Sequence, residues 1–353
     1  MRSLSVRVLV GCLLAAAAVS SAAAAGEGPP LSRKEDVVYG RKHGMALTMD
    51  VFTPKKANGA AIIMVMSGGW FSSHDWVSPA EADEFLKRGY TVFEVVHGSQ
   101  PRFTIPEILE DLHRAVRYIR FHAGDYHIDP NRIGINGGSA GGHLSLMQGT
   151  TGTAGDPKAK DPVDRVSSRV QAVACFFPPT DFLNYGEKGK DALGRGTLAG
   201  FKAPFDFTEL DKKTSSYVLI TDEDRRREIG RKISPVNHVT KESAPTLIIH
   251  GDADKLVPIQ QAEEMVARLK SAGVSAKLVV KPGAGHGWKG LKQDMTLIAD
   301  WFDRYLGEKG PRDTAPPDRA RRPHRVGRGT RSTVEFSGAR VPECPWHGLL
   351  DNG

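Results

Sequence analysis

The stretch that most constrains the fold is residues 133–143, which read IGINGGSAGGH. A short apolar run leads into glycines on both sides of one serine, Ser139, and apolar residues then recur at helical spacing. This pattern predicts a strand, a tight turn at Ser139 and a helix, the context of a Gly-x-Ser-x-Gly nucleophile elbow. The chain holds 38 glycines, so a glycine-rich turn without chemistry is the alternative, and the catalytic interpretation requires partners elsewhere.

Two later segments supply those partners. A serine hydroxyl is a weak nucleophile at neutral pH, so it needs a histidine to take its proton and a carboxylate to orient that histidine. Asp254 follows a predicted strand at residues 246–250, and His286 follows another at residues 277–281. Because the carboxyl ends of parallel strands meet at one edge of a sheet, Ser139, Asp254 and His286 are expected to meet there as a catalytic triad.

The hydrophobic pattern of the rest of the chain predicts the fold class. Residues 60–66, 91–96 and 170–177 are apolar runs typical of strands that are buried on both faces, and amphipathic helical patterns alternate with them. Residues 36–54 alternate more loosely and predict an antiparallel pair at a sheet edge. The expected fold is therefore α/β, with a mostly parallel central sheet covered by helices on both faces.

Three segments depart from this alternation. Residues 1–25 have the basic start, apolar run and small-residue end of a cleavable signal peptide, with an uncleaved anchor as the alternative. Residues 181–243 separate two predicted strands and predict a cap-like insertion before the acid-bearing strand. Residues 310–353 are rich in Arg and Pro and predict a disordered tail. This division leaves residues 26–309 as the catalytic domain.

Composition excludes several other classes of protein. The net charge of +7 lies mostly at the two ends, so the nearly neutral middle argues against nucleic-acid binding. The signal peptide implies a secreted or periplasmic protein. Its apolar run is shorter than the ~20 residues of a membrane span, so no stable membrane insertion is expected after cleavage. Three cysteines form no disulfide framework. No cofactor is expected because the chain lacks a dinucleotide fingerprint and a phosphate loop. No metal is expected because the candidate ligands lack metal-ligand spacing; these are His74, Asp75, His97 and His250.

The motifs at residues 137–143, 250–258 and 285–287 together resemble those of the α/β-hydrolase superfamily. Within it, the chain is similar to the secreted acetyl esterase/lipase branch. That branch resembles bifunctional feruloyl/acetylxylan esterases and is related to prolyl-oligopeptidase catalytic domains. The resemblance covers about residues 33–307. It implies an α/β-hydrolase fold with Asp254 as the acid, while Asp181 is a second candidate because some relatives take their acid from that position.

The same resemblance implies an oxyanion hole. Relatives carry His-Gly-Gly-Gly after the first long strand, where this chain has Ser67-Gly68-Gly69-Trp70. Backbone N–H groups donate whatever the side chain, so Ala140, Gly69 and Trp70 are the expected donors. Trp70 is also a candidate to line the acyl or leaving-group pocket. Trp288, beside the histidine, is a candidate sugar platform, with structural packing as the alternative.

These features predict a secreted serine carboxylic-ester hydrolase that acts through an acyl-enzyme on a small-molecule or glycan ester. The resemblance implies acetyl or feruloyl esters of polysaccharides as substrates. One alternative is a serine peptidase of the prolyl-oligopeptidase type. Those peptidases carry a large β-propeller before the hydrolase domain, and about ten residues separate the predicted signal from the first strand here. A non-catalytic binding protein with the same fold is the other alternative. The sequence indicates no particular oligomeric state.

Overall fold

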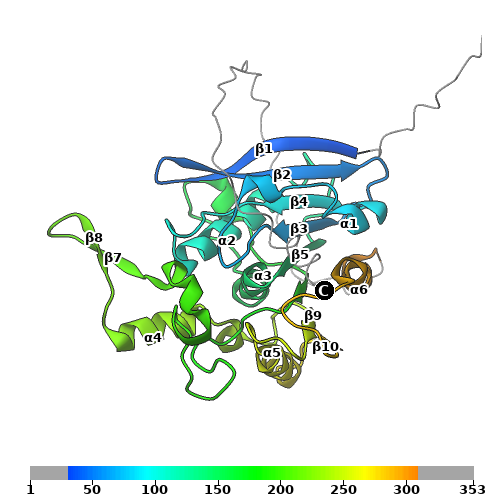
Figure 1. Cartoon of the computed structure of the whole chain (residues 1–353). Coiled ribbons are helices and arrows are strands. Elements are labelled where there is room, and N and C mark those ends of the chain that lie inside the picture. The colour runs from blue at the N-terminus through cyan, green and yellow to red at the C-terminus, as the bar shows by residue number, and fades with distance from the viewer. Residues whose placement is uncertain (1–30, 309–353) are drawn as a thin grey trace, which may run out of the picture. The chain divides into compact units, whose positions relative to one another are not determined.

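The computed structural model describes residues 31–308, which are built around one eight-stranded sheet (Figure 1). Its strand order is β1-β2-β4-β3-β5-β6-β9-β10. β1 pairs antiparallel with β2, and β2 pairs antiparallel with β4, whereas every other neighbouring pair is parallel. The strands are β1 (Leu31–Lys42), β2 (Met45–Pro54), β3 (Ala61–Val65), β4 (Thr91–Val95), β5 (Ile133–Gly138), β6 (Ala172–Phe176), β9 (Thr246–Gly251) and β10 (Ala276–Lys281).

Helices cover both faces of this sheet, as the apolar strands require. Every residue of β3, β4, β5, β6 and β9 is buried, because a parallel strand between two helical layers has no solvent-facing side. One apolar core lies under α2 (Ile105–Phe121), α3 (Ala140–Thr151) and α5 (Gln260–Ser271). The other lies under α1 (Asp83–Lys87) and α6 (Leu291–Leu306). The predicted fold class, a mostly parallel sheet with helices on both faces, is confirmed.

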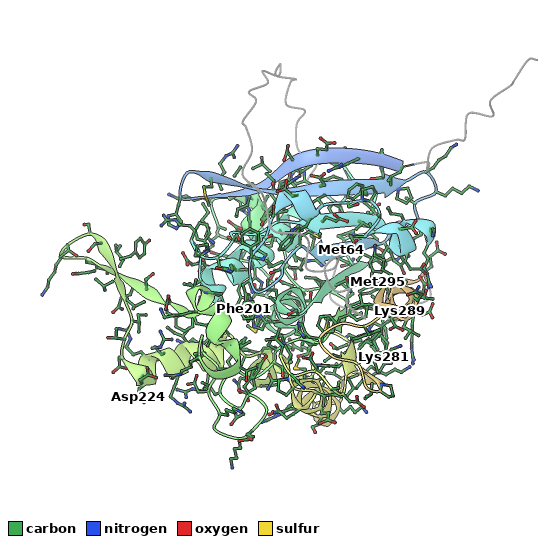
Figure 2. The ribbon with its side chains drawn as sticks, in the orientation of Figure 1. Met64, Phe201, Asp224, Lys281, Lys289 and Met295 are labelled. Carbon is green, nitrogen blue, oxygen red and sulfur yellow. The ribbon has the colours of Figure 1, made fainter. Side chains whose placement is uncertain are left out.

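The segment between β6 and β9 forms its own small elements. It contains η3 (Gly196–Phe201), η4 (Ala203–Phe205), the hairpin β7 (Thr208–Asp211) and β8 (Ser216–Leu219), α4 (Glu223–Lys232) and η5 (Pro235–His238). The β7–β8 hairpin projects away from the central sheet (Figure 1). Asp222 caps α4 by accepting a hydrogen bond from the Arg225 amide. Figure 2 shows Asp224 at the end of α4 that lies away from the central sheet, and Phe201 on the side of this segment that faces the sheet.

The remaining described elements are two short 3-10 helices, η1 (His74–Trp76) and η2 (Pro162–Arg165). Between residues 31 and 308, no helix combines the length and the apolar character needed to cross a lipid bilayer. The predicted signal peptide, residues 1–25, and the predicted tail, residues 310–353, lie outside the described residues, so both remain predictions.

Candidate active site

Ser139 occupies the turn between β5 and α3, and its backbone is strained. Its φ of 52° and ψ of −119° are unusual for an L-residue. The turn is held because the Ser139 amide donates to the carbonyl oxygen of Phe176, 3.0 Å away on the neighbouring strand. The end of β3 and the loop after it also pass close by, since a Cβ on Gly141 would lie 2.9 Å from the carbonyl oxygen of Val65 and 3.3 Å from that of Ser67. The elbow therefore aims the Ser139 side chain out of the helix and brings the loop after β3 beside it.

The three residues of the predicted triad form one chain of hydrogen bonds. Nε2 of His286 lies 2.9 Å from Oγ of Ser139, and Nδ1 of His286 lies 2.7 Å from Oδ2 of Asp254. A carboxylate only accepts, so Nδ1 carries the proton on that side and Nε2 is left to accept the proton of the serine. Ser139 follows β5, Asp254 follows β9 and His286 follows β10. The three carboxyl ends of parallel strands thus assemble a base beside a nucleophile.

The carboxylate of Asp254 is fully buried and well supplied with donors. Its Oδ1 accepts from the amides of Leu256 and Val257, both at 2.9 Å. Nε2 of His250 lies 3.3 Å from its Oδ2. Burial raises the pKa of Asp254, but the hydrogen bonds from His250, His286 and the Val257 amide outweigh burial and hold that pKa well below its usual value. Asp254 is therefore an anion at neutral pH and can stabilise a protonated His286.

Asp181, the second candidate acid, makes its hydrogen bonds elsewhere. Its carboxylate accepts from the Leu183 amide at 2.9 Å and from the Asn184 side chain at 2.8 Å. Asp181 therefore stabilises the first turn of the insertion, and it is Asp254 that contacts His286. Asp252 has a supporting position because its carboxylate accepts from the Gly283 amide at 2.6 Å. This bond ties the loop that carries Asp254 to the loop that carries His286.

The loop after β3 ends in a tight turn whose amides are candidate oxyanion donors. Gly68 and Phe71 exchange two backbone hydrogen bonds, 3.0 and 2.9 Å long. The two central residues both have positive φ, 54° at Gly69 and 62° at Trp70, as in a type I′ turn. The turn's own bonds therefore leave the Gly69 and Trp70 amides unused. The amide of Ala140 begins α3 and belongs to the helix's unpaired first turn.

The Trp70 side chain requires a correction to its expected place in the acyl or leaving-group pocket. It is only 2% exposed and lies in the core. Its indole Nε1 donates to Nδ1 of His143 over 3.1 Å. A buried indole N–H needs an acceptor, and His143 supplies one inside the protein, so the ring turns away from solvent. The backbone amide of Trp70 remains a candidate donor.

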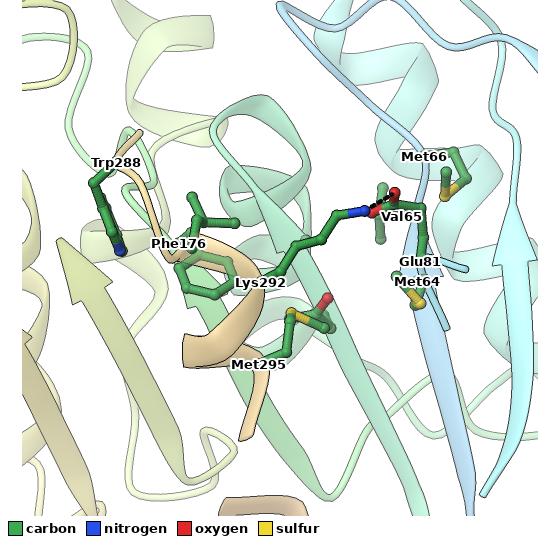
Figure 3. A pocket seen from close by; sticks show the side chains of 11 residues that line it. Met64, Val65, Met66, Glu81, Phe176, Trp288, Lys292 and Met295 are labelled. Carbon is green, nitrogen blue, oxygen red and sulfur yellow. Dashed lines mark ion pairs between the residues drawn. The ribbon is translucent and has the colours of Figure 1, made fainter. Parts of the chain in front are cut away.

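Trp288 lines a small pocket whose walls are mainly apolar (Figure 3). Its Nε1 donates to Oδ2 of Asp294 at 2.7 Å, which fixes the ring. Lys292 and Glu81 form an ion pair of 3.3 Å across this cavity. The other lining residues are mainly apolar and include Met64, Met66, Phe176, Leu291 and Met295. Gly137, two residues before the serine, also lines the cavity, and a substrate contact by Trp288 stays a prediction.

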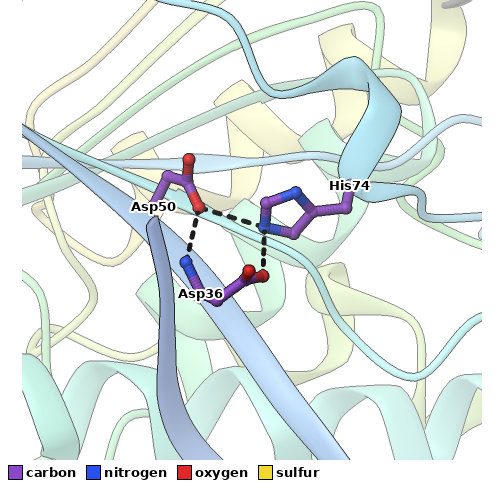
Figure 4. Close-up of side chains that lie close together, drawn as sticks. All are labelled: Asp36, Asp50 and His74. Carbon is purple, nitrogen blue, oxygen red and sulfur yellow. Dashed lines mark hydrogen bonds and ion pairs between the residues drawn. The ribbon is translucent and has the colours of Figure 1, made fainter. Parts of the chain in front are cut away.

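His74 has acidic neighbours that its sequence surroundings do not indicate (Figure 4). Its Nε2 lies 3.0 Å from Oδ1 of Asp50 and 3.3 Å from Oδ1 of Asp36. These are possible metal ligands, although Nε of Arg33 already donates to Oδ2 of Asp50 at 2.6 Å. The buried Asp50 carboxylate is thus compensated by the protein's own cation. The expectation of no metal stays a prediction.

The strand order, the elbow and the succession of serine, aspartate and histidine define an α/β-hydrolase. A family model described as BD-FAE matches residues 49–269, which is more than half of the chain. The protein belongs to the BD-FAE family. A second model, described as TAP-like protein, matches residues 227–313.

Curated relatives and solved structures carry esterase names. The chain is 27% identical to the probable carboxylic ester hydrolase LipM of Mycobacterium tuberculosis, over 67% of this chain and 51% of LipM. It is 29% identical to esterase LipC of the same organism, over 64% of this chain and 52% of LipC. The chain thus spans about half the length of the curated relatives it matches. It superposes with a TM-score of 0.59 on a truncated carbohydrate esterase from gut microbiota, at 28% identity and over 77% of this chain and 96% of that one.

Proposed function

We propose that this protein is a serine carboxylic-ester hydrolase whose nucleophile is Ser139. The observation that carries the proposal is the unbroken hydrogen-bond chain from Ser139 through His286 to Asp254. A binding protein would have no need for a strained serine, a correctly oriented imidazole and a buried anion at one point. The esterase names of the relatives and of the similar structures support the same reaction class.

Acylation follows from the geometry of the triad. Nε2 of His286 takes the proton as Oγ of Ser139 attacks the ester carbonyl carbon, and the Asp254 anion stabilises the resulting imidazolium. The carbonyl oxygen becomes an oxyanion, for which the amides of Ala140, Gly69 and Trp70 are the proposed donors. When the tetrahedral intermediate collapses, the C–O bond to the alcohol breaks. His286 returns its proton to the leaving alcohol, which leaves the acyl group on Ser139.

Deacylation repeats these steps with water as the nucleophile. His286 removes a proton from a water molecule, which attacks the acyl carbon, and the same amides hold the second oxyanion. Collapse breaks the bond to Oγ and returns the proton to Ser139. The acid is released and the enzyme is restored. No step needs a metal or an organic cofactor.

The proposed substrates are acetyl or feruloyl esters of polysaccharides, reached by export of the protein to the periplasm or the medium. Similarity to a carbohydrate esterase supports the substrate class, and the signal-like residues 1–25 support export.

The test is hydrolysis of p-nitrophenyl acetate by the purified chain beside Ser139→Ala, together with labelling by a fluorophosphonate. Turnover and labelling that both depend on Ser139 are expected. A folded chain that neither hydrolyses the ester nor takes the label would overturn the proposal in favour of a binding protein. Acetylated xylan and methyl ferulate then test the substrate class. Faster cleavage of N-acetyl-alanine p-nitroanilide would point to a peptidase.

A further inference from the structure

The tight turn of residues 68–71, called the oxyanion turn from here on, packs against the insertion, residues 181–243. The Trp70 ring packs against three phenylalanine rings, all from this segment. The centroid distances are 5.8 Å to Phe182, 6.4 Å to Phe201 and 5.2 Å to Phe205. The neighbouring residue is covered too, since a Cβ on Gly69 would lie 2.6 Å from Cδ1 of Phe201. The turn that carries two candidate oxyanion donors therefore packs directly against the insertion.

One buried histidine joins the turn to the insertion by hydrogen bonds. Nδ1 of His143 accepts from the indole of Trp70 at 3.1 Å, and its Nε2 donates to the carbonyl oxygen of Ile233 at 2.7 Å. Trp70 belongs to the oxyanion turn, whereas Ile233 ends α4 in the insertion. An indole N–H only donates and a carbonyl only accepts, so both ring nitrogens are satisfied by one neutral tautomer. Burial lowers the pKa of His143 to about 4, although the bond to Ile233 opposes this shift.

The backbone of the same histidine is fixed to the elbow. The His143 amide donates to the carbonyl oxygen of Ser139 at 2.9 Å and forms the first turn of α3. His143 therefore contacts the segment that carries the nucleophile, the turn that carries the donors and the insertion. Its side chain is fully buried, so it does not contact substrate. Its possible roles are packing and positioning.

We propose that the insertion holds the oxyanion turn in its donating geometry, and that His143 is the positioning residue that joins them. The inference rests on the proposed function. Oxyanion donors must lie about 2.7–3.1 Å from the developing charge, and the turn's own two hydrogen bonds fix the turn but not its orientation toward that charge. The indole bond to His143 and the three phenylalanine rings fix this orientation. We call these contacts between the turn and the insertion the joint. Loss of the joint should therefore weaken transition-state binding and leave substrate binding nearly unchanged.

Four variants, assayed with p-nitrophenyl acetate, test whether His143 joins the turn to the insertion. Trp70→Phe keeps a ring but removes the N–H, and His143→Leu removes both ring nitrogens. Each should lower kcat by about 10- to 100-fold with KM within about threefold, since complete loss of one oxyanion donor costs about 10²- to 10³-fold. The kcat of the double variant should be no lower than that of the less active single variant, because both changes break the same hydrogen bond. His143→Gln can still accept and donate, so it should recover at least tenfold over His143→Leu.

His113→Leu is the matched control. His113 is a half-buried histidine of α2, and its ring nitrogens lie 3.0 Å from Oγ of Ser168 and 3.3 Å from Oγ1 of Thr151 at the far end of α3. The control should lose thermal stability but keep kcat within about twofold. Amide hydrogen exchange gives a readout that is independent of activity. Peptides spanning residues 66–72 and 231–236 should exchange faster in Trp70→Phe and His143→Leu than in the wild type, and should be unchanged in His113→Leu.

The outcomes separate this inference from the proposed function. Wild-type chain that hydrolyses no ester refutes the proposed function, while faster exchange at both peptides would still support the joint. Unchanged exchange refutes the joint whatever the activity. An active enzyme whose kcat survives Trp70→Phe, or whose single losses multiply in the double variant, also refutes it. If His143→Leu does not fold, Trp70→Phe and His143→Gln decide the question, because His143→Gln nearly preserves the buried volume and Trp70→Phe keeps an aromatic ring at that position.

Discussion

Oδ2 of Asp254 lies 2.7 Å from Nδ1 of His286, while its Oδ1 accepts two backbone amides of its own loop. The carboxylate is therefore fixed before it meets the histidine, so that the imidazole needs no rearrangement to reach its working tautomer. Asp181 also follows a central strand, but its oxygens are used by Leu183 and Asn184. The acid of the proposed mechanism is chosen by which loop leaves a carboxylate oxygen free for the base.

Asp254→Asn should lower kcat for p-nitrophenyl acetate by about 10⁴-fold, because an amide at this position stabilises the wrong tautomer and cannot balance an imidazolium. Asp181→Asn is the matched variant. It should reduce the melting temperature, because it weakens the start of the insertion, and should keep kcat within about threefold. Steady-state kinetics on both folded variants provide the check. A larger loss at residue 181 than at residue 254 would exchange their roles.

The strained backbone of Ser139 predicts an unusual order of stabilities. In urea unfolding, the free energy of unfolding of Ser139→Gly should exceed that of Ser139→Ala by about 1 kcal/mol, because glycine adopts a φ of 52° without steric cost. Ser145, buried within α3, provides the opposite control. There glycine should be less stable than alanine by about 0.5 to 1 kcal/mol. If alanine were more stable than glycine at residue 139 as well as at residue 145, the elbow would store no such strain.

The fold and the triad could be predicted from sequence because each depends on local patterns. Apolar runs mark the buried strands, of which β5 leads directly to Ser139 and β9 to the loop of Asp254, while His286 lies in the loop after the edge strand β10. The contact between Trp70 and His143 could not be predicted, since it joins residues 73 positions apart and involves a histidine typical of ordinary helix packing. The same applies to His74, whose partner Asp50 comes from a neighbouring strand. Contacts between loops depend on tertiary packing, for which a single sequence carries no periodic signal.

Gly69→Ala should lower kcat because a Cβ there would collide with the Phe201 ring and because its φ is 54°. We expect a loss of about tenfold or more. The double variant Gly69→Ala/Phe201→Ala should recover part of it by removing the obstructing ring. Gly44→Ala separates strain from collision, since Gly44 has a φ of 81° and open space around it. It should cost stability and leave kcat unchanged. Absence of recovery in the double variant would mean that strain at residue 69, and not the insertion, causes the loss.

Glu94 predicts a pH dependence of stability that is separate from catalysis. It lies fully buried on β4, where its Oε2 accepts from the Ser78 amide at 2.8 Å. Its buried Oε1 has no hydrogen-bond partner among residues 31–308. Burial raises the pKa of Glu94 to about 8, and the nearby Glu81 and Asp50 add to this rise, while the Ser78 amide opposes it. The folded protein therefore holds a proton that the unfolded chain releases near pH 4.3.

Between pH 4.3 and 8 the folded state binds more protons at Glu94 than the unfolded state does, so this group's contribution to stability is lost as pH rises. Glu94→Gln stays neutral and keeps an acceptor for Ser78. The difference between its free energy of unfolding and that of the wild type should therefore increase in favour of the variant, by on the order of 3 kcal/mol, from pH 5 to pH 8. Urea unfolding of both proteins at the two pH values measures this difference. Glu110→Gln changes an exposed glutamate on α2, and its free energy of unfolding should change with pH as that of the wild type does. If the free energy of unfolding of Glu94→Gln also changed with pH as the wild type's does, Glu94 would already be ionised in the folded protein at pH 5.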